Sequence, residues 1–140
     1  MALHRLAPLA LLLGLGGSGA GAQPAIPTRT PIAVFPLAGG KQVSRVETTQ
    51  VDFQPGQVMP EHMHPVPVVC FVARGDFLVK IGDAPEKPAP FGSATYEAPG
   101  VTVHYFKNAS QTAPARLLCA ALAGADDKVI SVMLDRPPAK

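Results

Sequence analysis

Hydrophobic and polar residues alternate along short stretches of this chain, and turn residues separate the stretches. In residues 41–53, Val51 and Phe53 share one parity while Gln50 and Asp52 share the other, which predicts a half-buried strand. We expect no helix of convincing length. Further strands are expected at 32–35, 62–64, 68–73, 77–81, 94–97, around His104, at 116–123 and at 129–134. About eight to ten short strands at this spacing predict an all-β sandwich or barrel.

The composition indicates a single domain and argues against a nucleic-acid partner. The chain has 140 residues, of which 47% are hydrophobic and 16% charged, so it can form one domain with a buried core. Its net charge is only +2, and basic residues do not cluster, so we expect no nucleic-acid partner. Sixteen prolines and thirteen glycines suit many turns between short strands.

The first 22 residues have the three parts of a secretory signal peptide. His4 and Arg5 precede the apolar run 6–15, and Ala20-Gly21-Ala22 forms a small-residue cleavage site. The apolar run is too short to span a membrane. We therefore expect a periplasmic or secreted protein with no membrane contact after cleavage. The remaining chain divides into an extended arm (23–40), the domain (41–135) and a polar tail (136–140).

Histidines supply the main candidate chemistry. His62 and His64 are two residues apart in a proline-bounded segment, so on an extended chain both imidazoles point to the same side. Two converging imidazoles are typical of a metal site. Apart from His4 in the signal segment, the one other histidine is His104, which also follows a turn. We therefore predict a metal site formed by these three histidines.

The two cysteines, Cys70 and Cys119, both lie in apolar runs. In an oxidising compartment, an even pair in a small domain often forms a disulfide. Two buried free thiols that pack as small hydrophobic residues are equally compatible with these runs. The residues alone leave both interpretations open.

The chain also resembles the cupins, over about residues 43–122. The first cupin motif is a glycine, five residues, H-x-H and, further on, a glutamate and a glycine. The second is a glycine, P-x-G, a histidine and an asparagine. The matching residues are Gly56, His62, His64 and Gly75 for the first motif, and Gly92, Gly100, His104 and Asn108 for the second.

This sequence departs from the cupin pattern at two places. Val68 stands where the first motif has its glutamate, so the usual carboxylate ligand is absent. Three residues rather than two separate Gly100 from His104, which we interpret as a loop variation. Glu61 and Glu97 are candidates for the missing ligand. Glu61 has the opposite parity to His62 and should point outward, while the sequence assigns no role to Glu97.

The resemblance implies a double-stranded β-helix, or jelly-roll barrel, with a divalent metal ion in its mouth. The metal would be Fe, Zn, Ni, Cu or Mn. Val68, Phe106 and Asn108 are expected to line the pocket. The strand that begins near Val68 would lie beside the strand of Cys119, which favours a disulfide between Cys70 and Cys119.

Two functions follow from this resemblance. The first is a metal-dependent enzyme, such as a dioxygenase or isomerase, acting on a small and anionic or chelating molecule. The second is a non-catalytic periplasmic cupin that binds a small ligand or metal. Enzyme status stays open, because no candidate general acid or base has a clear inward position. A degenerate cupin without its metal is a third interpretation, and the resemblance also suggests a homodimer.

Overall fold

The computed structural model describes residues 29–37, 40 and 42–134. Ten short strands account for the regular structure of these residues, which contain no helix. They are β1 (Arg45–Phe53), β2 (Val58–Met59), β3 (His62–Met63), β4 (Val68–Arg74), β5 (Phe77–Ile81), β6 (Lys87–Ala89), β7 (Ala94–Glu97), β8 (Thr102–Asn108), β9 (Ala115–Ala123) and β10 (Val132–Met133). The all-β prediction is confirmed.

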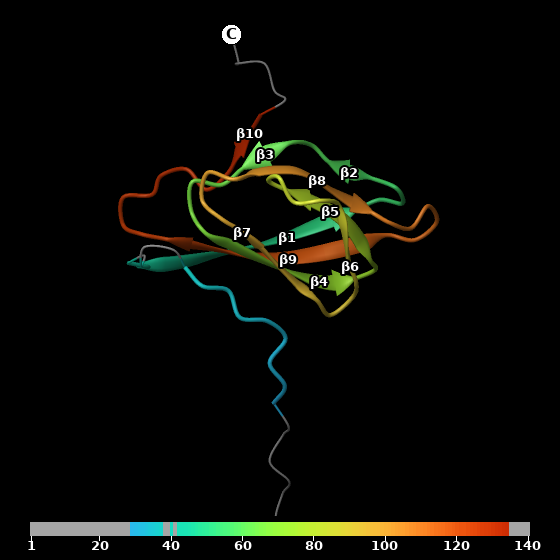
Figure 1. Cartoon of the computed structure of the whole chain (residues 1–140), viewed down its shortest axis with the longest axis horizontal. Coiled ribbons are helices and arrows are strands. Elements are labelled where there is room, and N and C mark those ends of the chain that lie inside the picture. The colour runs from blue at the N-terminus through green and yellow to red at the C-terminus, as the bar shows by residue number, and fades with distance from the viewer. Residues whose placement is uncertain (1–28, 38–39, 41, 135–140) are drawn as a thin grey trace, which may run out of the picture.

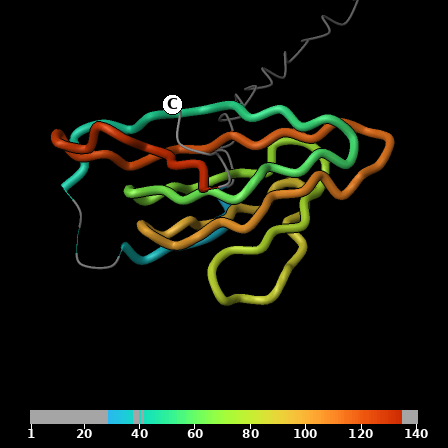
Figure 2. The backbone as a smooth tube through the Cα atoms, turned by 90° about the horizontal axis from the view of Figure 1, so that it is seen from above, coloured from blue at the N-terminus to red at the C-terminus, as the bar shows by residue number. Residues whose placement is uncertain are grey.

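The strands form two antiparallel sheets that face each other (Figure 1). One sheet has the order β1-β9-β4-β7. The other has the order β10-β3-β8-β5-β6, and β2 pairs with β8 beside it. Figure 2 shows the two longest strands, β1 and β9, side by side along the length of the molecule. This arrangement is the predicted double-stranded β-helix.

Several stretches differ from their predicted structure. No strand was expected at β2, and only Val132–Met133 of the expected strand 129–134 form β10. Residues 32–35 form no strand, although Phe35 stacks on Tyr96 of β7 with ring centroids 5.5 Å apart. Residues 87–89, where no strand was expected, form β6 and pair with β5. The predicted signal peptide and polar tail lie outside the described residues. No helix among the described residues is long and apolar enough to cross a membrane.

The core consists of two apolar clusters between the sheets. The larger contains Phe53 and Phe77, whose rings meet edge to face with centroids 4.9 Å apart, together with Phe106 and Leu117. The smaller contains the buried residues Val66, Val68, Cys70 and Ala121. The alternation in β4 explains this burial, because Val68, Cys70 and Val72 all face inward.

Glycine closes the turn between β4 and β5. Gly75 has a φ of +69°, a conformation that strains other residues, and a Cβ there would lie 2.9 Å from the Cβ of Ala115. The turn therefore joins the two sheets where only glycine fits.

Candidate metal centre

Prolines hold the histidine segment in the extended form that the sequence predicted. Pro60 and Pro65 bracket it, and β3 contributes only two residues to the sheet. The backbone amide of Gly100 donates a hydrogen bond of 2.8 Å to the carbonyl of His64, which ties this segment to the turn before β8. The rings of His62 and His64 face the same side, with centroids 5.1 Å apart.

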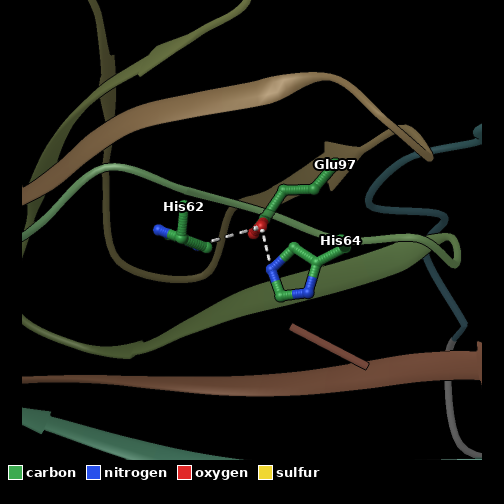
Figure 3. A group of neighbouring side chains, drawn as sticks. All are labelled: His62, His64 and Glu97. Carbon is green, nitrogen blue, oxygen red and sulfur yellow. Dashed lines mark ion pairs between the residues drawn. The ribbon is translucent and has the colours of Figure 1, made fainter. Parts of the chain in front are cut away.

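A glutamate from the opposite sheet completes the cluster. Glu97 Oε2 lies 2.9 Å from Nε2 of His64 and 3.7 Å from Nε2 of His62 (Figure 3). The three candidate ligand atoms all lie within 4.8 Å of one another. Glu97 is only 2% exposed and His62 only 7% exposed, so the cluster is shielded from solvent.

The backbone determines which nitrogen of each ring faces the carboxylate. Nδ1 of His62 lies 2.9 Å from the carbonyl of Pro60, and Nδ1 of His64 lies 2.7 Å from the carbonyl of Ile130. A carbonyl only accepts hydrogen bonds, so each Nδ1 must carry a proton and donate it. In the neutral tautomer both Nε2 lone pairs therefore point toward Glu97, as metal ligands do.

The Glu97 carboxylate lacks ordinary hydrogen-bond donors. Oε2 is buried and has no hydrogen-bond partner among the described residues. Oε1 lies 3.1 Å from Sγ of Cys70, but this sulfur is part of a disulfide and carries no hydrogen to donate. A buried carboxylate without donors is costly unless a cation compensates it. The two imidazoles and this carboxylate therefore fit a divalent metal ion.

Protons are the alternative cations at this cluster. Burial lowers the pKa of His62, but contact with Glu97 and the Pro60 carbonyl raises it by more, so the net pKa lies above the ordinary value. Burial likewise raises the pKa of Glu97, but the two histidines lower it by more, so the net pKa lies below the ordinary value. A metal ion must therefore compete with a proton on His62.

His104 does not join this cluster, which corrects the predicted three-histidine ligand set. Its Nδ1 lies 2.7 Å from Oε1 of Glu61, and both side chains are about one-third exposed, at 37% and 34%. The cause is a bulge in β8. Tyr105 pairs with Lys80 while Val103 pairs with the next residue, Ile81, so His104 is the extra residue.

The extra residue after Gly100 is accommodated by a bulge within β8, and not by the loop variation that we expected. Val103 takes the inward position that alternation assigned to His104, and it is fully buried. Phe106 and Asn108 remain buried beyond the bulge. Glu61, predicted to point outward, is the partner of His104 at the surface.

Glu97 was one of the two candidates for the missing ligand, without a predicted direction for its side chain, although one signal pointed inward. Glu97 is the cross-strand partner of Val68, the position at which the cupin motif has its glutamate. Facing residues of two paired strands point to the same side of the sheet. The carboxylate therefore reaches the same space from the neighbouring strand.

A cavity of about 230 Å³ opens beside the cluster, and all three candidate ligands line it. Val68 and Phe106 line this cavity, whereas Asn108 does not. The Asn108 side chain is fully buried and bridges loops instead, donating to the carbonyls of Gln54 and Ala113.

The cavity wall includes the predicted disulfide. Cys70 and Cys119 are bonded, and they are direct cross-strand partners on β4 and β9. The disulfide prediction is thus confirmed. Both cysteines line the cavity. The bond joins β9 to β4, and β4 pairs with β7, the strand that carries Glu97.

Two imidazoles and one carboxylate form a recognised ligand set. With other coordination positions open, this set is typical of non-haem Fe(II) sites, and it also occurs with catalytic zinc. In comparison with three histidines, it places one negative charge next to the metal. The site would then be less cationic than the sequence suggested.

Comparison with known proteins agrees with this architecture. The family model of the cupin domain matches residues 49–121. No curated protein matches the chain in sequence.

Several solved structures share the fold at low sequence identity. The DMSP lyase DddQ from Ruegeria pomeroyi DSS-3 superposes with a TM-score of 0.54 at 17% identity, over 64% of this chain and 43% of its own. An oxalate oxidase in complex with glycolate gives 0.54 at 22% identity, over 64% and 46%. A double-stranded β-helix protein from Klebsiella pneumoniae gives 0.51 at 19% identity, over 66% and 84%. The chain therefore spans less than half the length of the two enzymes.

Proposed function

Since the chain belongs to the cupin family, we propose that it is an exported, metal-dependent cupin that acts on a small molecule held in its barrel. His62, His64 and Glu97 would hold the metal. The observation that carries this proposal is the buried Glu97 carboxylate, whose Oε2 has no ordinary hydrogen-bond partner among the described residues and faces two Nε2 atoms. Export rests on the predicted signal peptide and is tested by the N-terminal mass of the mature protein.

The bound metal would supply a Lewis acid, or with iron a redox centre for a dioxygenase or isomerase reaction. The protein itself would orient the two imidazoles and exclude water from the cavity. The Pro60 and Ile130 carbonyls fix the two imidazoles, and the apolar wall keeps the substrate dry. Two of the structural neighbours are enzymes by name, a DMSP lyase and an oxalate oxidase, which is consistent with catalysis but does not choose a reaction.

A non-catalytic ligand-binding cupin is the second candidate, and one observation favours it. Among the described residues that line the cavity, Glu47 is the one titratable side chain outside the cluster. Its carboxylate is bound to Arg45 at 2.7 Å and is partly exposed. No free general acid or base therefore faces the cavity, and all chemistry would depend on the metal.

Metal content tests the proposal first. The mature protein, free of any tag, is loaded with Fe(II), Zn(II), Ni(II), Cu(II) or Mn(II) in turn and measured by elemental mass spectrometry. We expect about one ion per chain in the wild type and little in His64→Ala. Equal metal in both proteins, or none in either, would contradict the proposed site. Oxygen consumption or turnover with the loaded protein then separates the enzyme from the binding protein.

The resemblance to other cupins also supports a homodimer. Phe71 and Leu118 are cross-strand partners on the outer face of the four-stranded sheet, and they are 43% and 45% exposed. We propose that this apolar pair contacts a second copy of the chain. Light scattering should give a mass of two chains, and Phe71→Ser should reduce it to one.

A further inference from the structure

The residues that line the cavity indicate the polarity, size and charge of the ligand, which the metal cluster alone does not. Beside the cluster, side chains from both sheets form an apolar wall that includes Val51, Phe53, Met59, Phe106, Leu117 and Met133. Apolar walls bind apolar groups because these groups leave water. The body of the ligand should therefore be apolar.

The size of the cavity limits this body. Its volume is about 230 Å³. An apolar protein cavity of about 150 Å³ is large enough to bind benzene. One substituted ring, or a branched chain of similar volume, would therefore fill the space.

Charge limits the polar head of the ligand. No lysine or arginine is among the described residues that line the cavity, and Thr49 and Ser131 are its neutral polar groups. Glu47 also lines the cavity, but Arg45 balances its charge at 2.7 Å. A divalent metal next to the Glu97 carboxylate leaves one positive charge. A single negative charge on the ligand would balance it. A second one would stay unpaired in an apolar space, which is unfavourable.

We propose that the ligand is a monoanionic oxygen chelator on a single small apolar body, of the kind represented by a singly deprotonated alkylcatechol. Three protein ligands leave adjacent coordination positions for two oxygens of the chelator. This inference rests on the proposed metal site. The proposed ligand differs from a small dianion such as oxalate, which carries two charges and lacks an apolar body.

A matched pair of test compounds examines the proposal. 4-Methylcatechol and 3,4-dihydroxybenzoate have the same chelating head, but one carries a methyl group where the other carries a carboxylate. Calorimetric titration into the Zn(II)-loaded wild-type protein should give binding of the carboxylate compound that is about 30-fold weaker or more. Equal or tighter binding of 3,4-dihydroxybenzoate, or of oxalate, would overturn the proposal.

Variants that fill the cavity locate the apolar body. Val51→Phe, on β1, should weaken 4-methylcatechol binding at least about tenfold by occupying its space, while Zn(II) affinity stays within about twofold. Met133→Phe, on the short strand β10, serves the same purpose if Val51→Phe folds poorly. Unchanged 4-methylcatechol affinity in a folded variant would contradict this placement.

A metal-free arm separates failure of the inference from failure of the metal site. Toluene has the apolar body without the chelating head, so it should raise the melting temperature of the metal-free wild type but not that of the filled variant. If no metal binds but toluene does, the proposed function fails and the apolar cavity stands. If toluene has no effect on the wild type, the inference about the ligand is overturned.

Discussion

The contacts His64–Glu97 and His104–Glu61 have nearly equal lengths and very different surroundings. His64 lies 2.9 Å from Glu97, and His104 lies 2.7 Å from Glu61. The first glutamate is 2% exposed, and its Oε2 has no ordinary hydrogen-bond partner in the described part of the chain, whereas the side chain of the second is 34% exposed. A short distance therefore does not identify a metal site.

The ring nitrogens differ in the same way. His64 uses Nδ1 for a backbone carbonyl and turns Nε2 toward the carboxylate. His104 turns Nδ1 itself toward Glu61, in an ordinary surface pair. Surface pairs contribute at most about 1 kcal/mol, whereas a buried carboxylate requires a cation. The same substitution should therefore have a large effect at the Glu97 contact and a small effect at the Glu61 contact.

The largest expected effect is on metal affinity. Glu97→Gln keeps the shape of the side chain but removes the charged ligand, so Zn(II) affinity should fall by about 100-fold or more. The matched control Glu61→Gln should stay within about twofold of the wild type. Competition with a chromophoric chelator measures both. Equal losses in the two variants would contradict the distinction between the pairs.

The next effect is on stability, at the disulfide beside Glu97. Replacing Cys70 and Cys119 together by alanine should lower the free energy of unfolding by about 2–4 kcal/mol, because the bond closes a long loop. For a domain of this size, about 10–20 °C in melting temperature would be lost. Thermal unfolding by circular dichroism, with and without a reducing agent, measures this. A wild-type protein insensitive to reduction would count against the bond.

The pH dependence of the metal-free protein gives a smaller effect. The raised pKa of His62 adds stability below the ordinary value of 6.5, and this stability is lost as the pH rises through the raised value. The lowered pKa of Glu97 adds stability above the ordinary value of 4.5, and this stability is lost as the pH falls through the lowered value. The metal-free protein should therefore be most stable between about pH 4.5 and 6.5.

Denaturant unfolding across pH tests this window. Glu97→Gln removes the group that raises the pKa of His62, so its stability should vary less with pH in this range. Glu61→Gln should keep the wild-type profile. Zn(II) should move the optimum to higher pH, because the metal requires His62 without its Nε2 proton. A profile unchanged in Glu97→Gln would show that the buried pair does not titrate as described.

The smallest effect belongs to the surface pair. His104→Ala should change the free energy of unfolding by less than about 1 kcal/mol, since its contact with Glu61 is partly exposed and screened. Chemical unfolding at low and high salt measures this difference. A loss of more than about 2 kcal/mol would mean that the pair supports the bulge in β8.

Alternation predicted the fold because most strands pair without interruption. In β4, residues 68, 70 and 72 face inward as their parity required, and the cross-strand position of Cys119 follows. The same rule failed in β8, because a bulge changes the parity after Val103. The sequence contains the extra residue there, but alternation alone does not say whether a loop or a strand absorbs it.

Glu97 was a candidate ligand, but the direction of its side chain could not be predicted, for a different physical reason. In β7, Ala94 and Tyr96 form the more apolar side, which suggests that they face inward and that Glu97 faces solvent. Instead Phe35 of the N-terminal arm stacks on Tyr96 outside the sheet, and Thr95 and Glu97 are buried. A contact with a distant segment of irregular structure is not visible in local periodicity.

The number of imidazoles that coordinate the metal distinguishes the His62–His64–Glu97 site from a three-histidine site. Pulsed electron paramagnetic resonance of the Cu(II)-loaded protein counts the histidines that are coordinated to the ion. We expect two, with the same spectrum in His104→Ala and a loss of one imidazole in His64→Ala. Three coordinated imidazoles in the wild type, reduced to two in His104→Ala, would contradict this expectation and restore the three-histidine site.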